Sequence, residues 1–421
     1  MTSLLVHGAG YVVTATGAAR GPLRSWADLG GGKLDVAVES SESGWICTWV
    51  GAPDAADRPA CDETVDLGGR LLTPGFIDCH THAVFAGDRS EEFAERLNGR
   101  TYAEIAAAGG GILHTVAQTR AAPLHALVAA TLPRLEQMAA WGVRVLEIKT
   151  GYGLDLASEL KSLDAIADLQ RHFGPQLHLL ATAMPAHAIA PELRDQPERY
   201  VRDMCEKILP AMAGHPQKPR FCDVFIDRGF FDVPQAERIW KHAKMLGMRL
   251  KAHVDELADI GGLPWAIQNG AVSVEHLLHT DAAGIALLAA SGTVAVALPL
   301  TSVFLQEPLA PLRALVDAGA LVAVGTDCNP GSAMTTNLPL AMQMAVLLGK
   351  LTPQEALRAV TRNAALALAE PRGLTGRIAP GEPFLPSLFD WTHPAQLFYE
   401  FGAPPRALRM LELALLPAKV A

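Results

Sequence analysis

The chain has 421 residues, of which 50% are apolar and 19% are charged, and its formal net charge is -9. A chain of this length and apolar content can bury a large core and is too long for one small domain. Its negative charge and its lack of a Lys/Arg cluster argue against a nucleic-acid surface, so we expect a small molecule as the partner.

The N-terminal segment, Met-Thr-Ser-Leu-Leu-Val-His-Gly, has no basic stretch followed by a long apolar core, so we expect no signal peptide. Gly, Pro or a charged residue interrupts every apolar run before it reaches about 18 residues, the length that spans a membrane. The six cysteines form no Cys-x-x-Cys pair, and we expect all of them to be small buried residues in a reducing compartment. The sequence therefore predicts a cytoplasmic protein that contacts no membrane.

Residues 1–70 are rich in Gly, Ser, Thr and Val, with short extended runs at 3–6 and 45–50. This pattern predicts the N-terminal part of a small β domain. Within residues 71–370, short apolar runs alternate with Ala- and Leu-rich stretches, which indicates β/α units around a parallel sheet.

Eight strands are expected in this central region, at residues 75–79, 143–149, 177–182, 222–225, 249–253, 272–276, 293–298 and 321–326. Helices are expected between most of them, at residues 123–140, 156–173, 233–246, 263–269, 282–290 and 309–318. Eight parallel strands are the number that closes a barrel. The predicted fold class is therefore α/β, with a (β/α)8 TIM-type barrel domain.

After the barrel, Thr352 is expected to cap a helix, with Pro353 at its first position and Glu355 completing a capping box. Residues 371–421 are again broken by Gly and Pro. We expect them to form the C-terminal part of the small domain, a β-sandwich shared with residues 1–70. A central strand is disfavoured in part of this tail by Pro380, Pro383 and Pro386.

The segment Thr73-Pro-Gly-Phe-Ile-Asp-Cys-His-Thr-His82 ends a predicted strand with two histidines two positions apart. Side chains at i and i+2 of a strand lie on one face, so in a barrel both imidazoles are expected to point into the mouth. A His-x-His pair also occurs by chance on exposed strands and turns. Further ligand types at other strand ends are needed to favour a metal site.

Two such residues follow later predicted strands: His253 ends the fifth and Asp327 follows the eighth. In a barrel of this kind, the carboxyl ends of the strands meet at the active site. Three imidazoles and one carboxylate suit zinc or iron(II) and leave a position for water. We therefore predict one divalent metal held by His80, His82, His253 and Asp327.

Glu256 lies three residues after the ligand of the fifth strand, where it could accept a proton from water and pass it to a leaving nitrogen. Asp255 is the weaker alternative for this role. His276 ends the sixth strand and is expected to hydrogen-bond a reacting oxygen. Its neighbours Glu275 and His279 are expected to face outward or to lie in a loop. The fourth strand has no lysine for a bridging carbamate, which favours one metal over two.

Several motifs resemble the amidohydrolase superfamily and, within it, the imidazolonepropionase family. They lie at residues 73–82, 85–89, 107–112, 147–153, 187, 191–192, 253–256 and 325–331. The His-x-His pair and Asp327 are general to the superfamily. Arg89, the Gly-Tyr-Gly segment and the Asp-Cys-Asn-Pro-Gly segment are specific to the family.

The resemblance implies hydrolysis of the ring amide bond of 4-imidazolone-5-propanoate to N-formimidoyl-L-glutamate in histidine degradation, with one Zn or Fe ion per subunit. It is compatible with a homodimer. It assigns the four metal ligands named above and makes Glu256 the catalytic acid and base. It implies substrate contacts for Arg89, Tyr152, His187, Asn329, Gly331 and Ser332. A guanidinium such as that of Arg89 suits the carboxylate of such a substrate.

Two alternatives stay open. Another cyclic amidase or a deaminase of the superfamily would use nearly the same ligands, and an inactive barrel could serve as a binding protein. Arg89 and Asn329 favour an anionic lactam as the substrate. An inactive barrel could have lost a metal ligand or Glu256. None of these residues is missing from the sequence.

Overall fold

The structure is a computed structural model that describes residues 2–42, 44–100, 104 and 110–402. Its barrel strands are β8 (Phe76–Asp78), β9 (Val143–Lys149), β10 (His178–Ala186), β11 (Phe221–Ile226), β12 (Arg249–Val254), β13 (Ser273–His276), β14 (Val294–Ala297) and β15 (Leu321–Val324). Each strand pairs in parallel with the next along the chain, from β8 to β15. All eight predicted strands are thus confirmed, with small changes at their ends.

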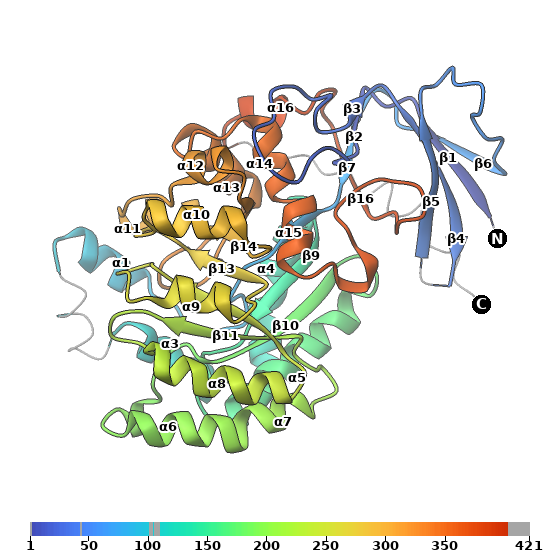
Figure 1. The fold of residues 1–421 in the computed structure, drawn as a ribbon. Helices are drawn as coiled ribbons and strands as arrows, with labels where there is room; N and C mark the ends of the chain where they lie inside the picture. Colours follow the sequence, from blue (N-terminus) through green and yellow to red (C-terminus); the bar gives the residue numbers. More distant parts are fainter. Residues whose placement is uncertain (1, 43, 101–103, 105–109, 403–421) are drawn as a thin grey trace.

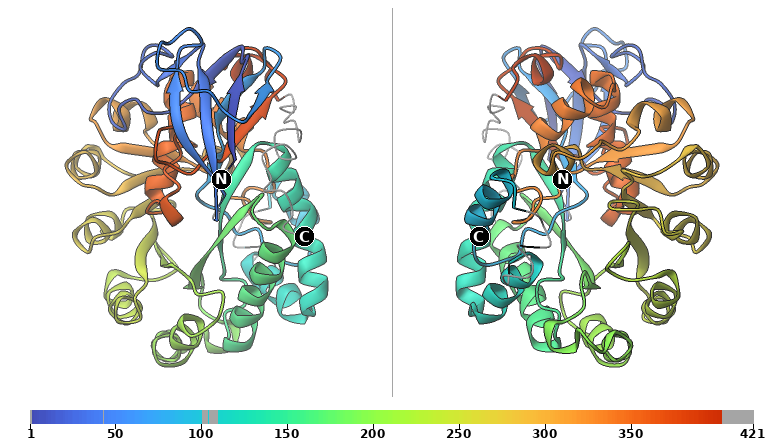
Figure 2. Two further views of the ribbon diagram at one scale, coloured as in Figure 1. Left: turned by 90° about the vertical axis from the view of Figure 1, so that its right-hand side faces the viewer. Right: turned by 90° about the vertical axis from the view of Figure 1, so that its left-hand side faces the viewer.

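Helices surround this sheet, as the views in Figure 1 and Figure 2 show. They are α1 (Ser90–Leu97), α3 (Ile112–Ala121), α4 (Leu124–Ala140), α5 (Leu156–Phe173), α6 (Pro197–Asp203), α7 (Leu209–Ala213), α8 (Val233–Met245), α9 (Gly262–Gln268), α10 (Ala282–Ala290), α11 (Pro299–Leu305), α12 (Leu312–Asp317), α13 (Leu338–Leu347), α14 (Pro353–Ala359), α15 (Arg362–Ala367) and α16 (Gln396–Tyr399). The predicted capping box at the start of α14 is present, because Thr352 and Glu355 each accept the backbone N–H of the other.

Two further sheets lie beside the barrel (Figure 1). Their strands are β1 (Ser3–His7), β2 (Tyr11–Val13), β3 (Gly31–Gly32), β4 (Asp35–Ser41), β5 (Gly44–Gly51), β6 (Glu63–Asp66), β7 (Leu71–Pro74) and β16 (Pro386–Phe389). The strand orders are β5-β4-β1-β6 and β16-β7-β2-β3, around a shared apolar core that includes Val36 and Leu388. The N- and C-terminal segments therefore build the predicted second domain.

The C-terminal strand β16 agrees with the proline argument, because it lies at a sheet edge and Pro386 is its first residue. β7 pairs with β16 and β2, so pairing within this domain extends past residue 70. The predicted boundaries at residues 70 and 370 stay a prediction. Residues 403–421 of the predicted tail and 107–109 of one motif lie outside the described residues.

The barrel closes where the end of β8 and the segment after it meet the segment that follows β15. Asp78 Oδ1 accepts the backbone N–H of Thr326 at 3.1 Å, and its Oδ2 accepts the Thr326 hydroxyl at 2.6 Å. Just beyond, Thr81 and Cys328 form a parallel bridge, and the N–H of Asp327 donates to the carbonyl of His80 at 3.0 Å. Barrel closure therefore brings the His-x-His segment against the strand-eight aspartate.

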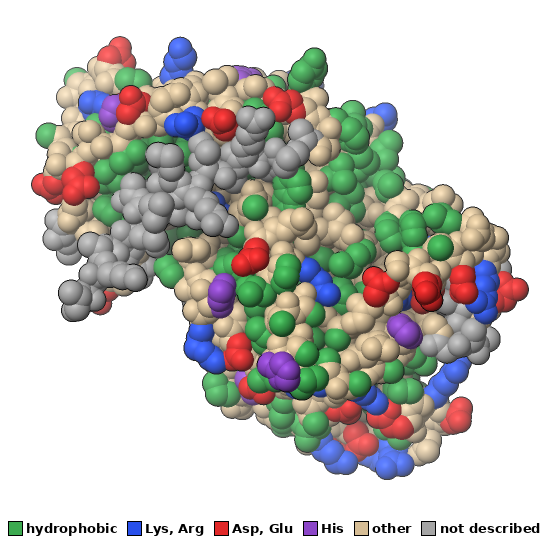
Figure 3. All heavy atoms as spheres, turned by 180° about the vertical axis from the view of Figure 1, so that it is seen from behind, with side chains coloured by type: hydrophobic (Ala, Val, Ile, Leu, Met, Phe, Trp, Pro, Cys, Tyr) green, Lys and Arg blue, Asp and Glu red, His purple; other side chains and the backbone are tan. Residues whose placement is uncertain are grey.

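Five of the six cysteines are buried, but Cys61 is partly exposed, so its predicted burial is wrong. It lies in an irregular segment of the small domain, two residues before β6. On the face seen in Figure 3, acidic and basic side chains are interspersed, and the coloured basic side chains do not gather into one area. Among the described residues, no helix is long and apolar enough to cross a membrane.

Candidate active site

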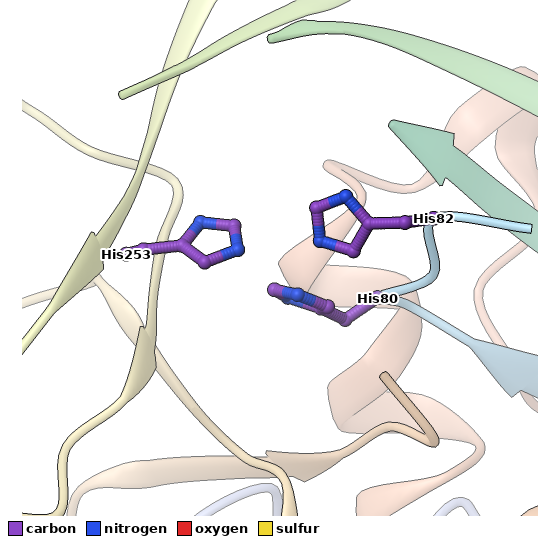
Figure 4. Close-up of side chains that lie close together, drawn as sticks. All are labelled: His80, His82 and His253. Atoms are coloured by element: carbon purple, nitrogen blue, oxygen red, sulfur yellow. The ribbon is translucent and has the colours of Figure 1, made fainter. Parts of the chain in front are cut away.

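The two histidines of the His-x-His segment lie just beyond β8, which ends at Asp78, and not within the strand. Their imidazoles nevertheless point into the same space as that of His253, from the opposite side of the barrel mouth (Figure 4). The ring centroids of His80 and His253 are 4.6 Å apart, and those of His82 and His253 are 5.5 Å apart. The structure thus brings the three predicted imidazole ligands together.

Asp327 joins this group. Its Oδ1 lies 3.4 Å from His80 Nε2 and 3.7 Å from His82 Nε2. Its Oδ2 accepts the hydroxyl of Thr301 at 2.7 Å, which fixes the carboxylate with Oδ1 toward the imidazoles. Ligand atoms of His80, His82 and His253 lie within 4.8 Å of one another, and so do those of His80, His276 and Asp327.

The donor atoms of this group fit a metal ion. His80 Nε2 and His253 Nε2 are buried and have no hydrogen-bond partner in the structure. Such atoms are costly to bury unless something binds them. His253 Nδ1 donates to Asp223 Oδ1 at 2.9 Å, which leaves the lone pair of its Nε2 free for a ligand. Buried imidazoles with one carboxylate support a divalent metal here.

Glu256 and His276 lie together at the edge of this group. His276 Nε2 is 3.3 Å from Glu256 Oε2. Burial raises the pKa of Glu256 well above its usual range, and Asp327 and Asp227 raise it further. Burial lowers the pKa of His276 well below its usual range, so its ring is neutral at pH 7. A carboxyl group that holds a proton readily, beside a neutral imidazole, is suited to proton transfer.

A cavity of about 310 Å³ opens over these residues. Of the predicted site residues, all but His80 line it; His80 is completely buried. The cavity is also lined by residues that are not among the predicted site residues, namely Glu92, Arg96, Ile112, Phe225, Phe230, Leu257, Leu305 and Glu307. Its walls combine apolar side chains with a few polar ones, as small-molecule sites do.

Arg89 forms a two-point ion pair with Glu92 on this wall. Its Nε donates to Glu92 Oε2 at 3.1 Å, and its Nη2 pairs with Glu92 Oε1. Glu92 also accepts the backbone N–H of Gly111 at 2.8 Å. A guanidinium has five N–H groups, so further donors remain for an anion in the cavity. Glu92, one turn after Arg89, was missed, although its spacing of three residues is typical of helical ion pairs.

Tyr152 and His187 pack together, with ring centroids 5.2 Å apart, and the ring of His187 stacks on that of His82 at 4.7 Å. His187 Nδ1 donates to the carbonyl of Gly151 at 3.2 Å. Gly151 has a φ of +106°, and a β-carbon there would lie 2.6 Å from the carbonyl oxygen of Met184. The glycine therefore lets the backbone approach Met184 and His187 closely.

Asn329 organises the loop after β15. Its amide nitrogen donates to the carbonyl of Asp327 at 2.7 Å and to Ser332 Oγ at 2.8 Å. Its Oδ1 accepts the backbone N–H groups of Gly331 and Ser332, each at 2.8 Å. The amide thus has its hydrogen bonds within the loop, and it holds Gly331 and Ser332 against the cavity.

Charged side chains fill part of the barrel interior beside the histidines. These fully buried residues are Glu147, Lys149, Asp223, Lys251 and Glu275. The expectation that Glu275 faces outward or lies in a loop is wrong, whereas His279 is exposed as expected. All four residues of β13 are buried, because one face of a barrel strand points into the barrel and the other packs against the surrounding helices, so Glu275 and its neighbour His276 are both buried. Ionisable residues two positions apart on buried strands, such as Glu147 and Lys149, were the available signal.

The amidohydrolase family model matches residues 71–399. The chain is similar to the imidazolonepropionase of Herpetosiphon aurantiacus, with 43% identity over 89% of this chain and 88% of that protein. The imidazolonepropionases of Symbiobacterium thermophilum (45% identity, 87% and 86% covered) and Chloroflexus aggregans (42% identity, 96% of each chain covered) are also similar.

Solved structures share the fold. A 5-methylcytosine deaminase from Klebsiella pneumoniae aligns with a TM-score of 0.70 and 17% identity, over 94% of this chain and 95% of that one. A zinc-bound adenosine deaminase from Xanthomonas campestris aligns with a TM-score of 0.66 and 19% identity, over 96% and 89%. With the sequence matches above, the chain belongs to the amidohydrolase family and, within it, to the imidazolonepropionases.

Proposed function

We propose that this protein hydrolyses the ring carbon–nitrogen amide bond of 4-imidazolone-5-propanoate to give N-formimidoyl-L-glutamate, a step of histidine degradation. One observation carries the proposal. A single cavity joins the His and Asp ligand group, the Glu256–His276 pair and the guanidinium of Arg89. The first two suit hydrolysis of an amide, and the third suits a substrate that carries a carboxylate.

We propose that His80, His82, His253 and Asp327 hold one zinc or iron ion per subunit. The ion would supply Lewis acidity, which activates a water molecule and polarises the ring carbonyl. The buried, unpartnered nitrogens of His80 and His253 support this assignment. The carboxylate of Asp327, held by Thr301, supplies the single negative ligand.

Glu256 is proposed as the proton carrier. It accepts a proton from the attacking water and donates it to the departing ring nitrogen. Burial of Glu256 raises its pKa and favours the protonated form, which is the form that donates a proton to the departing nitrogen. His276, 3.3 Å from Glu256, is proposed to hydrogen-bond the oxygen that gains negative charge during attack.

The substrate carboxylate is proposed to pair with Arg89, whose orientation Glu92 fixes. Tyr152 and His187, whose rings pack together in the cavity wall, are proposed to contact the substrate ring. The Ser332 hydroxyl and the backbone at Gly331 contact the substrate from the loop that Asn329 shapes. Asn329 itself lines the cavity and acts mainly by holding this loop.

The test is to identify the product. Metal-loaded protein is incubated with 4-imidazolone-5-propanoate, and mass spectrometry is used to look for N-formimidoyl-L-glutamate. A gain of one water with retention of both ring nitrogens supports the proposal, whereas release of ammonia would favour a deaminase. A cytoplasmic location stays a prediction from the sequence, and a homodimer stays compatible with the family resemblance.

A further inference from the structure

Five ionisable side chains lie in the barrel interior beside the proposed metal ligands, and all are completely buried: Glu147, Lys149, Asp223, Lys251 and Glu275. Charges removed from water are costly unless they pair closely. This group combines two ammonium groups with three carboxylates, and nothing in the proposed reaction uses it. Its arrangement therefore needs a reason of its own.

Lys149 is at the centre of the group. Its Nζ lies 2.7 Å from Asp223 Oδ2, 3.2 Å from Glu275 Oε2 and 3.2 Å from Glu147 Oε2. An ammonium has three N–H groups, so each carboxylate can take one. Burial alone would lower the pKa of Lys149, but the attraction of Asp223, Glu147 and Glu275 outweighs it and raises the pKa well above its usual range. The second ammonium of the group, Lys251 Nζ, lies 2.6 Å from Glu147 Oε2.

Two of these carboxylates also face the proposed metal ligands. Asp223 Oδ1 accepts the Nδ1–H of His253 at 2.9 Å. Glu275 Oε2 lies 3.3 Å from His80 Nδ1, an ion-pair distance, although this nitrogen makes no hydrogen bond in the structure. A carboxylate on one ring nitrogen fixes the tautomer and the direction of the other, which is how outer partners orient metal-binding histidines. Both carboxylates also contact Lys149, and Glu275 Oε1 in addition contacts Lys251 at 3.2 Å and accepts the Ser273 hydroxyl at 2.7 Å.

In the absence of the Lys149 ammonium, the space between Asp223, His253 and Glu275 could receive a metal cation. Ligand atoms of Asp223, His253 and Glu275 lie within 4.8 Å of one another, the spacing of a group that can hold a metal ion. The Nζ of Lys149 is within 3.2 Å of both carboxylates. Without this ammonium, Asp223 and Glu275 would repel each other, and Asp223 would be the less restrained of the two, because Glu275 keeps its contacts with Lys251 and Ser273.

We propose that Lys149 is a positioning residue, an internal cation that orients Asp223 and Glu275 so that His253 and His80 present their Nε2 atoms to the metal. Its ammonium also occupies the space in which a second metal ion would bind. The inference rests on the metal centre of the proposed function and extends it inward by a further layer of residues. Lys149 itself does not line the substrate cavity.

The experiment compares wild-type protein, Lys149→Met and Lys161→Met as metal-free full chains titrated with Co²⁺ alone. Affinity is measured by equilibrium dialysis, and coordination geometry by the visible absorption of bound Co²⁺. Lys161 is a matched control, because its Nζ donates to three backbone carbonyls at 2.8 to 2.9 Å and contacts no member of the group. Lys149→Met is expected to bind Co²⁺ about tenfold more weakly or worse, with an altered absorption band. Lys161→Met is expected to match the wild type in both.

The outcomes separate the two proposals. If wild-type protein binds about one Co²⁺ and Lys149→Met binds it with the same affinity and spectrum, the role of Lys149 is overturned while the metal centre stands. If the wild type binds no Co²⁺, the metal centre is overturned and the inference with it.

A second measurement needs no folded Lys149 variant. Histidine ring ¹⁵N spectra of metal-free wild-type protein, with the His253 signal assigned by its loss in His253→Gln, should have the proton of His253 on Nδ1. A proton on Nε2 would contradict the proposal.

Discussion

The guanidinium of Arg89 packs so closely against Gly331 that a β-carbon at position 331 would lie 2.2 Å from Arg89 Nη1. The contact joins the segment before α1 to the loop after β15, which are far apart in sequence. The contact explains why position 331 is a glycine, whereas the next position, Ser332, carries a side chain. Because Gly331 has no side chain, Arg89 can keep the position from which it would bind a substrate carboxylate.

Gly331→Ala is therefore expected to displace Arg89 and to lower kcat/KM for 4-imidazolone-5-propanoate roughly 10- to 100-fold, the cost of a lost charged hydrogen bond. The loss should appear mainly in KM, because Arg89 binds a part of the substrate that does not react. Gly292→Ala is the control, since nothing lies within 4 Å of a β-carbon there. Steady-state kinetics of both variants decide; an unchanged KM in Gly331→Ala would remove Arg89 from carboxylate binding.

Glu256→Gln is expected to lower kcat by about 10²- to 10⁴-fold while the protein keeps its metal, because the amide cannot carry the proton. Asp255→Asn is the matched control. The carboxylate of Asp255, the residue next to Glu256, accepts the hydroxyl of Thr280 at 2.7 Å, and Asp255 does not line the cavity. Turnover and metal content are measured on the same samples. Full activity of Glu256→Gln, or a large loss in Asp255→Asn alone, would transfer the acid–base role to Asp255.

Asp78→Ala is expected to destabilise the protein by about 2 kcal/mol or more, because it leaves two buried donors of Thr326 unpaired where the barrel closes. Asp62→Ala removes the same kind of contacts, to the N–H and hydroxyl of Ser3, but at an exposed site. Its midpoint of unfolding should barely move. Urea unfolding of both variants in the presence of a chelator separates this effect from metal binding, and equal midpoints would speak against closure through Asp78.

Metal removal is expected to abolish turnover and to lower Tm, because an ion that binds only the folded state stabilises it by mass action. Adding back about one equivalent of zinc or iron(II) should restore both. His253→Ala should no longer retain metal after dialysis, whereas His279→Ala, at an exposed position outside the cavity, should retain it. Chelated protein with full activity would argue against a metal-dependent reaction.

The thiols should differ in reactivity. Burial raises the pKa of Cys47 to about 12 and that of Cys328 to about 12, so almost none of either is thiolate at pH 8. Cys61 is partly exposed, and we expect it to be the first to react with a disulfide reagent in native protein. All six thiols should react in denaturant. Fast native reaction of several thiols would indicate a looser packing than the structure has.

The barrel could be predicted from sequence because each strand is a short apolar run between turn residues and an Ala- or Leu-rich helix. β9, for example, has the predicted bounds Val143–Lys149. The group of ligands followed from the rule that strand ends converge. The prediction of the barrel and the prediction of the ligand group both depend on local sequence patterns and on a topology with few alternatives.

Other features depend on backbone angles and on contacts between distant residues. His276, the last residue of β13, and Asp327, three residues after β15, have φ values of +76° and +53°, so strand alternation does not predict where their side chains point. Asp78 and Thr326 meet across 248 positions of sequence, and the pairing of Lys149 with Asp223 spans 74. Local patterns do not encode such pairs. The sequence suggests buried charge only through ionisable residues at alternate positions of apolar strands.

The most direct test of the central claim follows the ring absorbance of 4-imidazolone-5-propanoate in the presence of purified protein with a measured metal content. With about one metal ion per chain, the absorbance should fall with enzymatic turnover, and Glu256→Gln carrying the same metal should leave it unchanged within the same time. Metal-loaded wild-type protein that leaves the absorbance unchanged would contradict the proposed reaction.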